Sequence, residues 1–434
     1  MHTAGTQMIA APYAAAVPPA RSAVQALSLR LILWCLASGF VVIIEPAPSD
    51  LFFVLGLGVL MLAGGRNLFL PAPLHAHFGL LLAFVALNIV SLFVAHSFMF
   101  GLKYLLITVY LLLIPPVMAH FAFLMGRTAL DRMHMAFTIG ASISAVIGLM
   151  ALLRVAPGPL TLYFRADDGL RLAPLFKDPN VYGPYMSAAG LLLVSRMCCE
   201  GAKLRSLGLG LAGFILLLMF LTFSRGAWLN SAVAGTVFIV CMLVFAGTWR
   251  QVKWVVILLA AACVLLLVGG PFVLGRLGLT DFFADRAQIQ TYDANRFGNW
   301  AVALDVIRLE PLGIGPGHYV GRKNFPQSAF VLATHNVYLK VAVENGWFGF
   351  VTFFGAIGSL LAALFVSFFK RDTRQPVRIM LFAIILGQLA NSVVVDSLHW
   401  RHFFVVLGFA CGEIALVARE RWVRRNPESE GRPG

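Results

Sequence analysis

The sequence predicts an all-α polytopic membrane protein with about 12 transmembrane helices, and three observations lead to this prediction. Hydrophobic residues occupy 60% of the 434 positions and charged residues only 12%, whereas soluble domains contain about 45–50% apolar and about 25% charged residues. Apolar stretches of bilayer-spanning length recur along the chain. Lys and Arg collect in alternate connections between them. These features exclude a soluble globule, a disordered chain and a disulfide-rich scaffold.

Twelve apolar stretches have lengths compatible with membrane spans, although the second is short. The predicted spans are 27–45, 50–64, 75–96, 102–124, 132–154, 180–197, 205–223, 226–246, 253–272, 345–369, 379–397 and 401–418. They divide the chain into a tail at 1–26, spans one to nine at 27–272, one large loop at 273–344, spans ten to twelve at 345–418 and a tail at 419–434. The first tail is expected to be retained, because the apolar stretch that follows is long enough to remain as a span.

The distribution of basic residues predicts that both termini are cytoplasmic. With the N-terminus inside, every short inner connection contains Lys or Arg, while the outer turns 46–49 and 97–101 contain neither. The formal net charge of +14 is therefore read by position and does not indicate a nucleic-acid partner. Two outer segments break the pattern, namely 155–179, with Arg165, Arg171 and Lys177, and the long connection 273–344. Either longer loops translocate regardless of charge, or these cations meet an anion at the outer membrane surface.

The large loop at 273–344 contains a predicted short helix and a predicted turn. Phe297, Trp300, Leu304 and Ile307 follow helical spacing, so an amphipathic helix is expected to end before Pro311. The glycine-rich stretch 312–317 lacks the lysine and the preceding strand of a phosphate-binding loop. It is therefore interpreted as a tight turn.

Arg225 is the first candidate functional residue. It lies in a very short outer turn between two apolar spans, where an unpaired arginine costs up to about 2.5–3.5 kcal/mol on insertion scales. It is either a snorkelling interfacial arginine or an anion ligand, because a guanidinium fork matches phosphate oxygens. Ser224 and Thr222 could add hydroxyl donors.

Arg171 is the second candidate, and it leads into the sixth span. Asp178-Pro179-Asn180 has the composition of a turn and helix start, which would direct the positive end of the helix outward. These residues either cap the helix and pack the loop, or contribute to an anion site.

His335 is the third candidate, just ahead of the tenth span. With Thr334 as N-cap, His335, Tyr338 and Ala342 would share one helix face. A histidine near a helix N-terminus favours the neutral imidazole, which can accept a proton, although a purely structural histidine would also fit. Glu344 could orient partners or cap the bend that follows it.

The last outer turn contains Asp396, His399, Trp400 and Arg401, in which Asp396 and Arg401 are expected to form a local ion pair. No serine-histidine-acid elbow, zinc-binding motif, Cys/His cluster or outer Asp-x-Asp occurs in the sequence, so no metal is expected. The ionisable residues lie almost wholly on one predicted face, which favours surface chemistry over a transport path.

Together the motifs resemble the O-antigen ligase family of the bacterial inner membrane, within a superfamily that includes O-antigen polymerases and protein O-oligosaccharyltransferases. The resemblance runs from about 160 to 350. It rests on Arg171…Phe176-x-x-Pro179-Asn180, Ser224-Arg225-Gly226, Pro311-x-Gly313-x-Gly315 and His335-Asn336-x-Tyr338…Glu344-x-Gly346. The lack of a large outer domain near the C-terminus favours the ligases.

The resemblance implies transfer of a polysaccharide from undecaprenyl diphosphate to a sugar hydroxyl of lipid A-core, on the periplasmic face. It further implies inversion at the anomeric carbon, no metal or other cofactor, and a glycosyltransferase-C-like fold. The expected partners are the lipid-linked O-antigen, lipid A-core and membrane lipids, with no nucleic acid and no obligatory protein partner. Arg171 and Arg225 would bind the diphosphate and His335 would deprotonate the hydroxyl. The implied positioning residues are Arg296, Tyr338, Glu344, Asn336 and Ser224. A polymerase, another lipid-linked glycan transferase, and a transporter or flippase remain alternatives.

Overall fold

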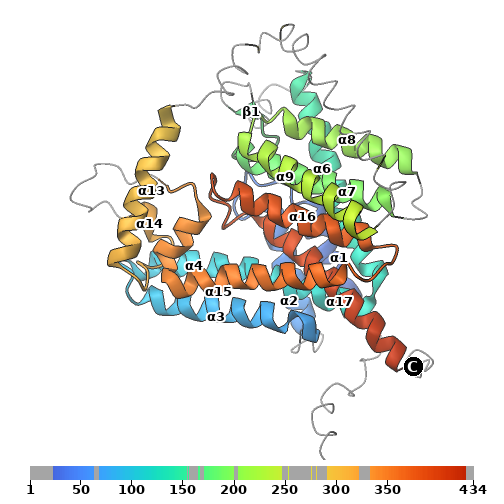
Figure 1. Cartoon of the computed structure of the whole chain (residues 1–434), viewed down its shortest axis with the longest axis horizontal. Helices are drawn as coiled ribbons and strands as arrows, with labels where there is room; N and C mark the ends of the chain where they lie inside the picture. Colours follow the sequence, from blue (N-terminus) through green and yellow to red (C-terminus); the bar gives the residue numbers. More distant parts are fainter. Residues whose placement is uncertain are drawn as a thin grey trace, which may run out of the picture.

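The computed structural model describes residues 23–62, 68–153, 155, 165–166, 171–199, 204–246, 253, 275, 280, 291–321 and 333–426. These residues form a helical bundle and one antiparallel pair of strands, β1 and β2, each two residues long (Figure 1). The predicted ninth span, 253–272, lies outside the described residues except for its first position. The fold class is thus confirmed as a mainly α-helical, multi-pass arrangement over the part of the chain that the structure describes.

The elements of the first half of the chain overlap the predicted spans, with bounds that differ by several residues. They are α1 (Ala23–Ala37), α2 (Pro48–Leu62), η1 (Ala72–Leu74), α3 (His75–Leu92), α4 (Phe98–Leu112), α5 (Ile114–Met125), α6 (Arg127–Leu152), β1 (Arg165–Ala166) and β2 (Arg171–Leu172). The second half contains α7 (Pro179–Cys198), α8 (Arg205–Phe220), α9 (Arg225–Cys241), η3 (Met242–Ala246), α13 (Thr291–Leu309), α14 (His318–Gly321), α15 (Val337–Ser367), α16 (Gln375–Asn391) and α17 (Arg401–Arg425).

Length and composition make several of these helices able to cross a membrane. Among the described residues, six helical segments are long and apolar enough, and four shorter apolar helices accompany them. Large apolar side chains are exposed on the peripheral helices, for example Leu62, Leu82 and Met99. Such exposure is costly in water but natural against lipid.

For two of the predicted spans, the local sequence explains why the bounds differ. The predicted span 102–124 is divided between α4 and α5, because Pro115 and Pro116 start a new helix better than they continue one. The predicted tenth span begins at 345, whereas α15 begins earlier, at Val337. Its helical path is interrupted at Gly346, whose φ of 68° is readily adopted only by glycine.

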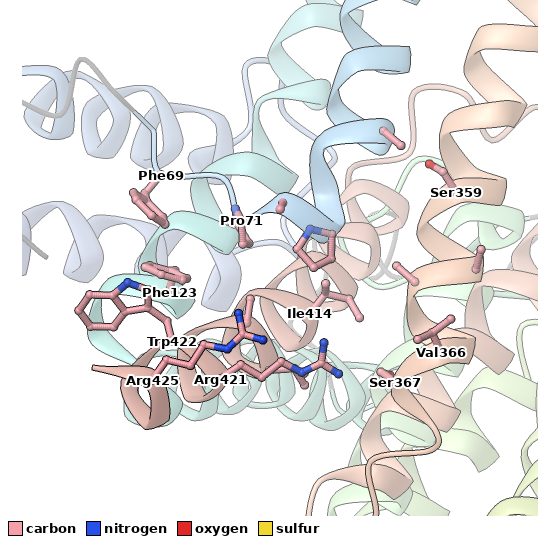
Figure 2. Close-up of a pocket in the computed structure, with 17 residues that line it drawn as sticks. Phe69, Pro71, Phe123, Ser359, Val366, Ser367, Ile414, Arg421, Trp422 and Arg425 are labelled. Carbon is pink, nitrogen blue, oxygen red and sulfur yellow. The ribbon is translucent and has the colours of Figure 1, made fainter. Parts of the chain in front are cut away.

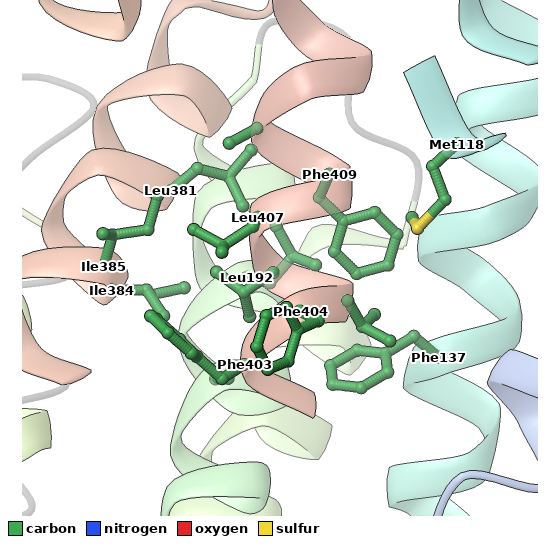
Figure 3. Close-up of a cluster of buried hydrophobic side chains, with 14 of the residues drawn as sticks. Met118, Phe137, Leu192, Leu381, Ile384, Ile385, Phe403, Phe404, Leu407 and Phe409 are labelled. Atoms are coloured by element: carbon green, nitrogen blue, oxygen red, sulfur yellow. The ribbon is translucent and has the colours of Figure 1, made fainter. Parts of the chain in front are cut away.

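The helix α17 forms the centre of the bundle. It packs along α5, and its side chains are apolar and buried on all sides for most of its length. Figure 3 shows Phe403, Phe404, Leu407 and Phe409 of α17 among side chains of four other helices. Those neighbours include Met118 of α5, Phe137 of α6, Leu192 of α7 and Leu381 of α16.

The two ends of the bundle differ in character. Figure 1 shows α13 lying across one end, while α17 carries the C-terminal part of the described chain out at the other. At that second end Arg374 forms buried ion pairs with Glu413 and Asp131. The candidate functional residues gather at the first end, where α7, α9 and α15 begin.

Candidate functional site

The helix α9 starts in the short turn that the sequence predicted. Ser224 is its N-cap, and the Ser224 hydroxyl accepts a hydrogen bond from the backbone N–H of Ala227 at 3.3 Å. Phe223, just before the cap, has a φ of 49°, a strained value for a residue with a side chain. Arg225 follows as the first helical residue and is half-buried. The turn therefore fixes Arg225 at the positive end of the α9 dipole.

Arg171 reaches this turn from β2. Its side chain is 5% exposed, and it donates to the backbone oxygen of Thr222 at 2.9 Å and to Asn180 Oδ1 at 3.0 Å. Ser224 Oγ donates to the same Asn180 oxygen at 3.0 Å. The Asn180 side-chain oxygen thus joins Arg171 to Ser224, although these two residues lie 53 positions apart in the sequence (224 − 171). Both of these acceptors are neutral oxygens.

The start of α7 completes this arrangement. Asp178 is the N-cap, and its carboxylate accepts from the backbone N–H of Asn180 at 2.7 Å. The capping interpretation of Asp178 is therefore confirmed. In addition, Gly183 allows α7 and α9 to approach closely, because a Cβ there would lie 2.5 Å from Ala227 Cβ.

The start of α15 differs from the prediction. Asn336, not Thr334, is the N-cap, and its side chain accepts from the backbone N–H of Leu339 at 3.1 Å. His335 lies outside the helix, half-buried, with a φ of 46°. The predicted common face with Tyr338 and Ala342 is therefore wrong for His335, since Asn336 supplies the better capping geometry and starts the helix two residues later.

The strained backbone of His335 lies next to a hydrogen bond from α13. Trp300 of α13 donates from its indole nitrogen to the backbone oxygen of Thr334 at 2.8 Å. Non-glycine residues with positive φ persist only where surrounding contacts fix them, and they cluster at functional sites. The predicted helix around Trp300 is confirmed as α13, although its buried face includes Ala303 and Val306 while Leu304 is exposed.

The last turn of α16 connects the starts of α9 and α15. The backbone N–H of Val337 donates to Ser392 at 3.0 Å, and the Tyr338 hydroxyl donates to Leu389 at 3.0 Å. A Cβ on Gly226 would collide with the side chain of Asn391. Both helix starts therefore contact the same short segment, 389–392. The Asn391 amide is fully buried and makes no hydrogen bond within the described residues, a feature that sequence reasoning missed.

Glu344 holds the glycine-rich turn in place. Its backbone oxygen accepts a hydrogen bond from the backbone N–H of Gly315 at 3.0 Å, and the backbone oxygen of Val343 accepts one from Ile314 at 3.0 Å. Gly313, Gly315 and Gly317 all have positive φ, so the predicted tight turn is confirmed. The described contacts of Glu344 are those of a residue that anchors the loop.

The predicted ion pair between Asp396 and Arg401 is wrong. Asp396 pairs with the buried Lys340, at 2.6 Å between Nζ and Oδ2, and Arg401 pairs instead with Asp50 of α2. Lys340 was missed, although a lysine inside an otherwise apolar helix start is a usable signal. Close by, His399 Nε2 lies 3.0 Å from the Thr108 hydroxyl, and burial lowers the pKa of His399 to about 4, so the ring is neutral at pH 7.

Three further residues from the sequence analysis are Arg296, Lys177 and Ser224. Arg296 lies in α13, but its side chain falls outside the described residues. Lys177, one of the cations predicted to lie outside, forms a 2.6 Å ion pair with Glu45, and this lysine lowers the pKa of Glu45. Ser224 uses its hydroxyl in the cap and in the bond to Asn180, so its described role is to position the turn.

Three helix N-termini and two arginines therefore gather at one end of a multi-pass membrane protein. Helix N-termini and guanidinium groups both favour anions, and phosphate oxygens match both. The fold and the site thus define a membrane protein with a candidate anion-binding centre at one face.

The comparison with protein families identifies the domain. Residues 210–354 match the family model described as O-antigen ligase, which is 145 residues (354 − 210 + 1) or about a third of the chain. The chain therefore carries the domain of the O-antigen ligase family, as the motifs predicted. Arg225, His335 and Glu344 lie inside the matched segment, and Arg171 lies before it. No curated protein shows a significant match.

The matched domain indicates the general class of activity. The family belongs to the superfamily of O-antigen ligases and polymerases, which are glycosyltransferase-like membrane enzymes that act on lipid-linked glycans.

Proposed function

We propose that the protein is an O-antigen ligase that transfers a polysaccharide from undecaprenyl diphosphate to a sugar hydroxyl of lipid A-core. The observation that carries the proposal is the bridge through Asn180, which joins Arg171 to the Ser224–Arg225 turn at the starts of α7 and α9. A diphosphate leaving group needs charge stabilisation as the glycosidic bond breaks, and this arrangement offers it without a metal. The site would face the periplasm of the bacterial inner membrane, with both termini cytoplasmic.

The reaction is an inverting substitution at the anomeric carbon. The acceptor hydroxyl oxygen forms the new bond to this carbon while the bond to the diphosphate oxygen breaks. Arg171 and Arg225 neutralise the negative charge that develops on the diphosphate. His335 accepts the proton of the hydroxyl, a role that suits a half-buried imidazole beside a helix N-terminus. Asn336, Tyr338 and the loop around Arg296 would position the two substrates.

The experiment supplies purified protein with lipid-linked O-antigen, with and without lipid A-core. A ligase forms a polysaccharide–lipid A-core product only when the acceptor is present. Longer lipid-linked glycans formed without lipid A-core would identify a polymerase, which would use the same donor site. Movement of the donor across a bilayer without any transfer would indicate a flippase. A chelator should leave the rate unchanged.

Variants test the named roles. Arg225→Ala and His335→Ala should each lower the rate by about 10²–10³, the usual cost of losing one preorganised group that stabilises developing charge. Arg225→Lys should recover activity only in part, because lysine retains the charge but not the planar fork. The control is Arg308→Ala, which removes an exposed arginine of α13 whose ion pair is with Asp305, three positions before it. Wild-type activity of Arg225→Ala would refute the diphosphate role.

A further inference from the structure

A second site lies at the other end of the bundle. An open groove of about 770 Å³ is bounded by the segment before α3, by α5, and by the last turns of α15 and α17 (Figure 2). Its volume is within the range of about 300–1,000 Å³ that ligand sites occupy. The helix α15 starts at the candidate active site and runs 31 residues to Ser367 in this groove. At about 1.5 Å per residue, the two sites are separated by roughly the thickness of a bilayer.

The walls of the groove are mainly apolar. Phe69 and Phe123 stack with ring centroids 4.2 Å apart and form one side, and Figure 2 shows Ser359, Val366 and Ser367 on the other. The Val366 side chain is 61% exposed, so this wall is open on the lipid-facing side of α15. Apolar walls that open toward the bilayer favour a ligand with a hydrocarbon chain.

Two arginines place positive charge at the opening of the groove, which is called its mouth below. Arg421 and Arg425 extend from the last turns of α17 with Trp422 beside them, as Figure 2 shows. Both arginines are exposed, and neither side chain makes a hydrogen bond or an ion pair with another residue in the described part of the chain. They are four positions apart on one helix face, a spacing at which like charges repel. An anion held between them would relieve this repulsion.

We propose that this groove binds an anionic phospholipid, with an acyl chain along the apolar walls and the phosphate between Arg421 and Arg425. A lipid can contact both the apolar walls and the two arginines, whereas a soluble anion would leave the apolar walls unfilled. Basic pockets between transmembrane helices are known to hold anionic headgroups, and a tryptophan at the interface, as with Trp422, is typical of a membrane-facing edge. The proposal is independent of the glycan chemistry at the other end.

The experiment uses the full-length protein in neutral detergent micelles and follows tryptophan fluorescence. Phosphatidylglycerol brominated on its acyl chains is titrated in, and brominated phosphatidylethanolamine serves as the zwitterionic comparison. The difference between the wild-type protein and Trp422→Phe isolates the quenching of Trp422 from that of the other tryptophans. We expect Trp422 to be quenched at lower concentrations of the anionic lipid than of the zwitterionic lipid.

Charge variants then test the mouth of the groove. Each arginine near a membrane surface contributes affinity equivalent to about five-fold, so Arg421→Gln or Arg425→Gln should each weaken phosphatidylglycerol binding about five-fold and the double variant about thirty-fold. The matched control is Arg424→Gln, on the same exposed turn but outside the groove lining, which should change binding by less than about two-fold.

Several results would overturn the proposal. Equal quenching by the two lipids would remove the anion preference, and an equal loss in Arg424→Gln would reduce the effect to general surface charge. Glycerol phosphate alone should not bind; if it bound as tightly as the lipid, the site would be one for soluble anions. Removal of residues 427–434 should leave the titration unchanged, whereas tighter lipid binding would show that the acidic tail occupies the groove.

Discussion

Substitution of Asn180 by aspartate separates the charge of the candidate site from its geometry. The Asn180 side-chain oxygen accepts from Arg171 and from Ser224, both at 3.0 Å. A carboxylate can accept the same two hydrogen bonds, so the turn at Ser224 should keep its position. What changes is the charge, because a negative group then lies against the guanidinium that is proposed to bind the diphosphate.

The expected effect on the reaction can be worked out from this geometry. A phosphate held on the other side of the Arg171 guanidinium would lie about 6 Å from the new carboxylate. At that distance, and with an effective dielectric constant of about 20, Coulomb's law gives roughly 3 kcal/mol of repulsion per unit charge. We therefore expect kcat/KM for the lipid-linked donor to fall about a hundred-fold.

The assay pairs this rate with thermal unfolding in detergent. Asn180→Asp should unfold at or above the wild-type temperature, because it adds an ion pair and loses no hydrogen bond. Asn180→Ala should lose roughly 2–4 kcal/mol of stability, because one charged and one neutral hydrogen bond disappear. The control Asn426→Asp introduces the same charge at the opposite end of the bundle.

A wild-type rate for Asn180→Asp would refute the idea that Arg171 binds the departing phosphate. A similar loss of rate in Asn426→Asp would mean that overall charge, and not the position of the carboxylate, controls the reaction.

Two further predictions concern the fold around the site. Gly346→Ala should destabilise the protein by roughly 1–3 kcal/mol from backbone strain alone, and its Cβ would also collide with Pro311, whereas Gly358→Ala in the same helix meets no neighbour and should be tolerated; equal melting temperatures would contradict this. His399 has a pKa lowered from 6.5 to about 4 by burial, so the unfolded chain binds a proton that the folded protein does not, and stability should fall as the pH drops from about 6.5 to 4. His399→Gln should reduce that pH dependence of the melting temperature while His75→Gln, at an exposed histidine, should not; an unchanged slope in His399→Gln would refute the assignment.

The candidate residues could be predicted from sequence where their role depends on local context. Arg225 lies in a turn between two apolar helices, and that position follows from the spacing of hydrophobic residues alone. Asp178 before proline marks the start of α7 for a reason that is equally local, the capping of free N–H groups. The membrane class likewise follows from composition, because no arrangement of this chain could cover its apolar residues with polar ones.

The partners of these side chains in ion pairs and hydrogen bonds could not be predicted in the same way. Asp396 was expected to pair with Arg401, five positions away. In the structure the Lys340 Nζ lies 2.6 Å from the Asp396 carboxylate, and Arg401 pairs with Asp50. The bridge from Arg171 through Asn180 to Ser224 depends on how α7 packs against α9, and Gly183 permits that packing. Sequence thus determined which groups are present and which helices hold them. Ion pairs and hydrogen bonds, however, form only between groups that are close in space, and the tertiary structure decides which groups are close.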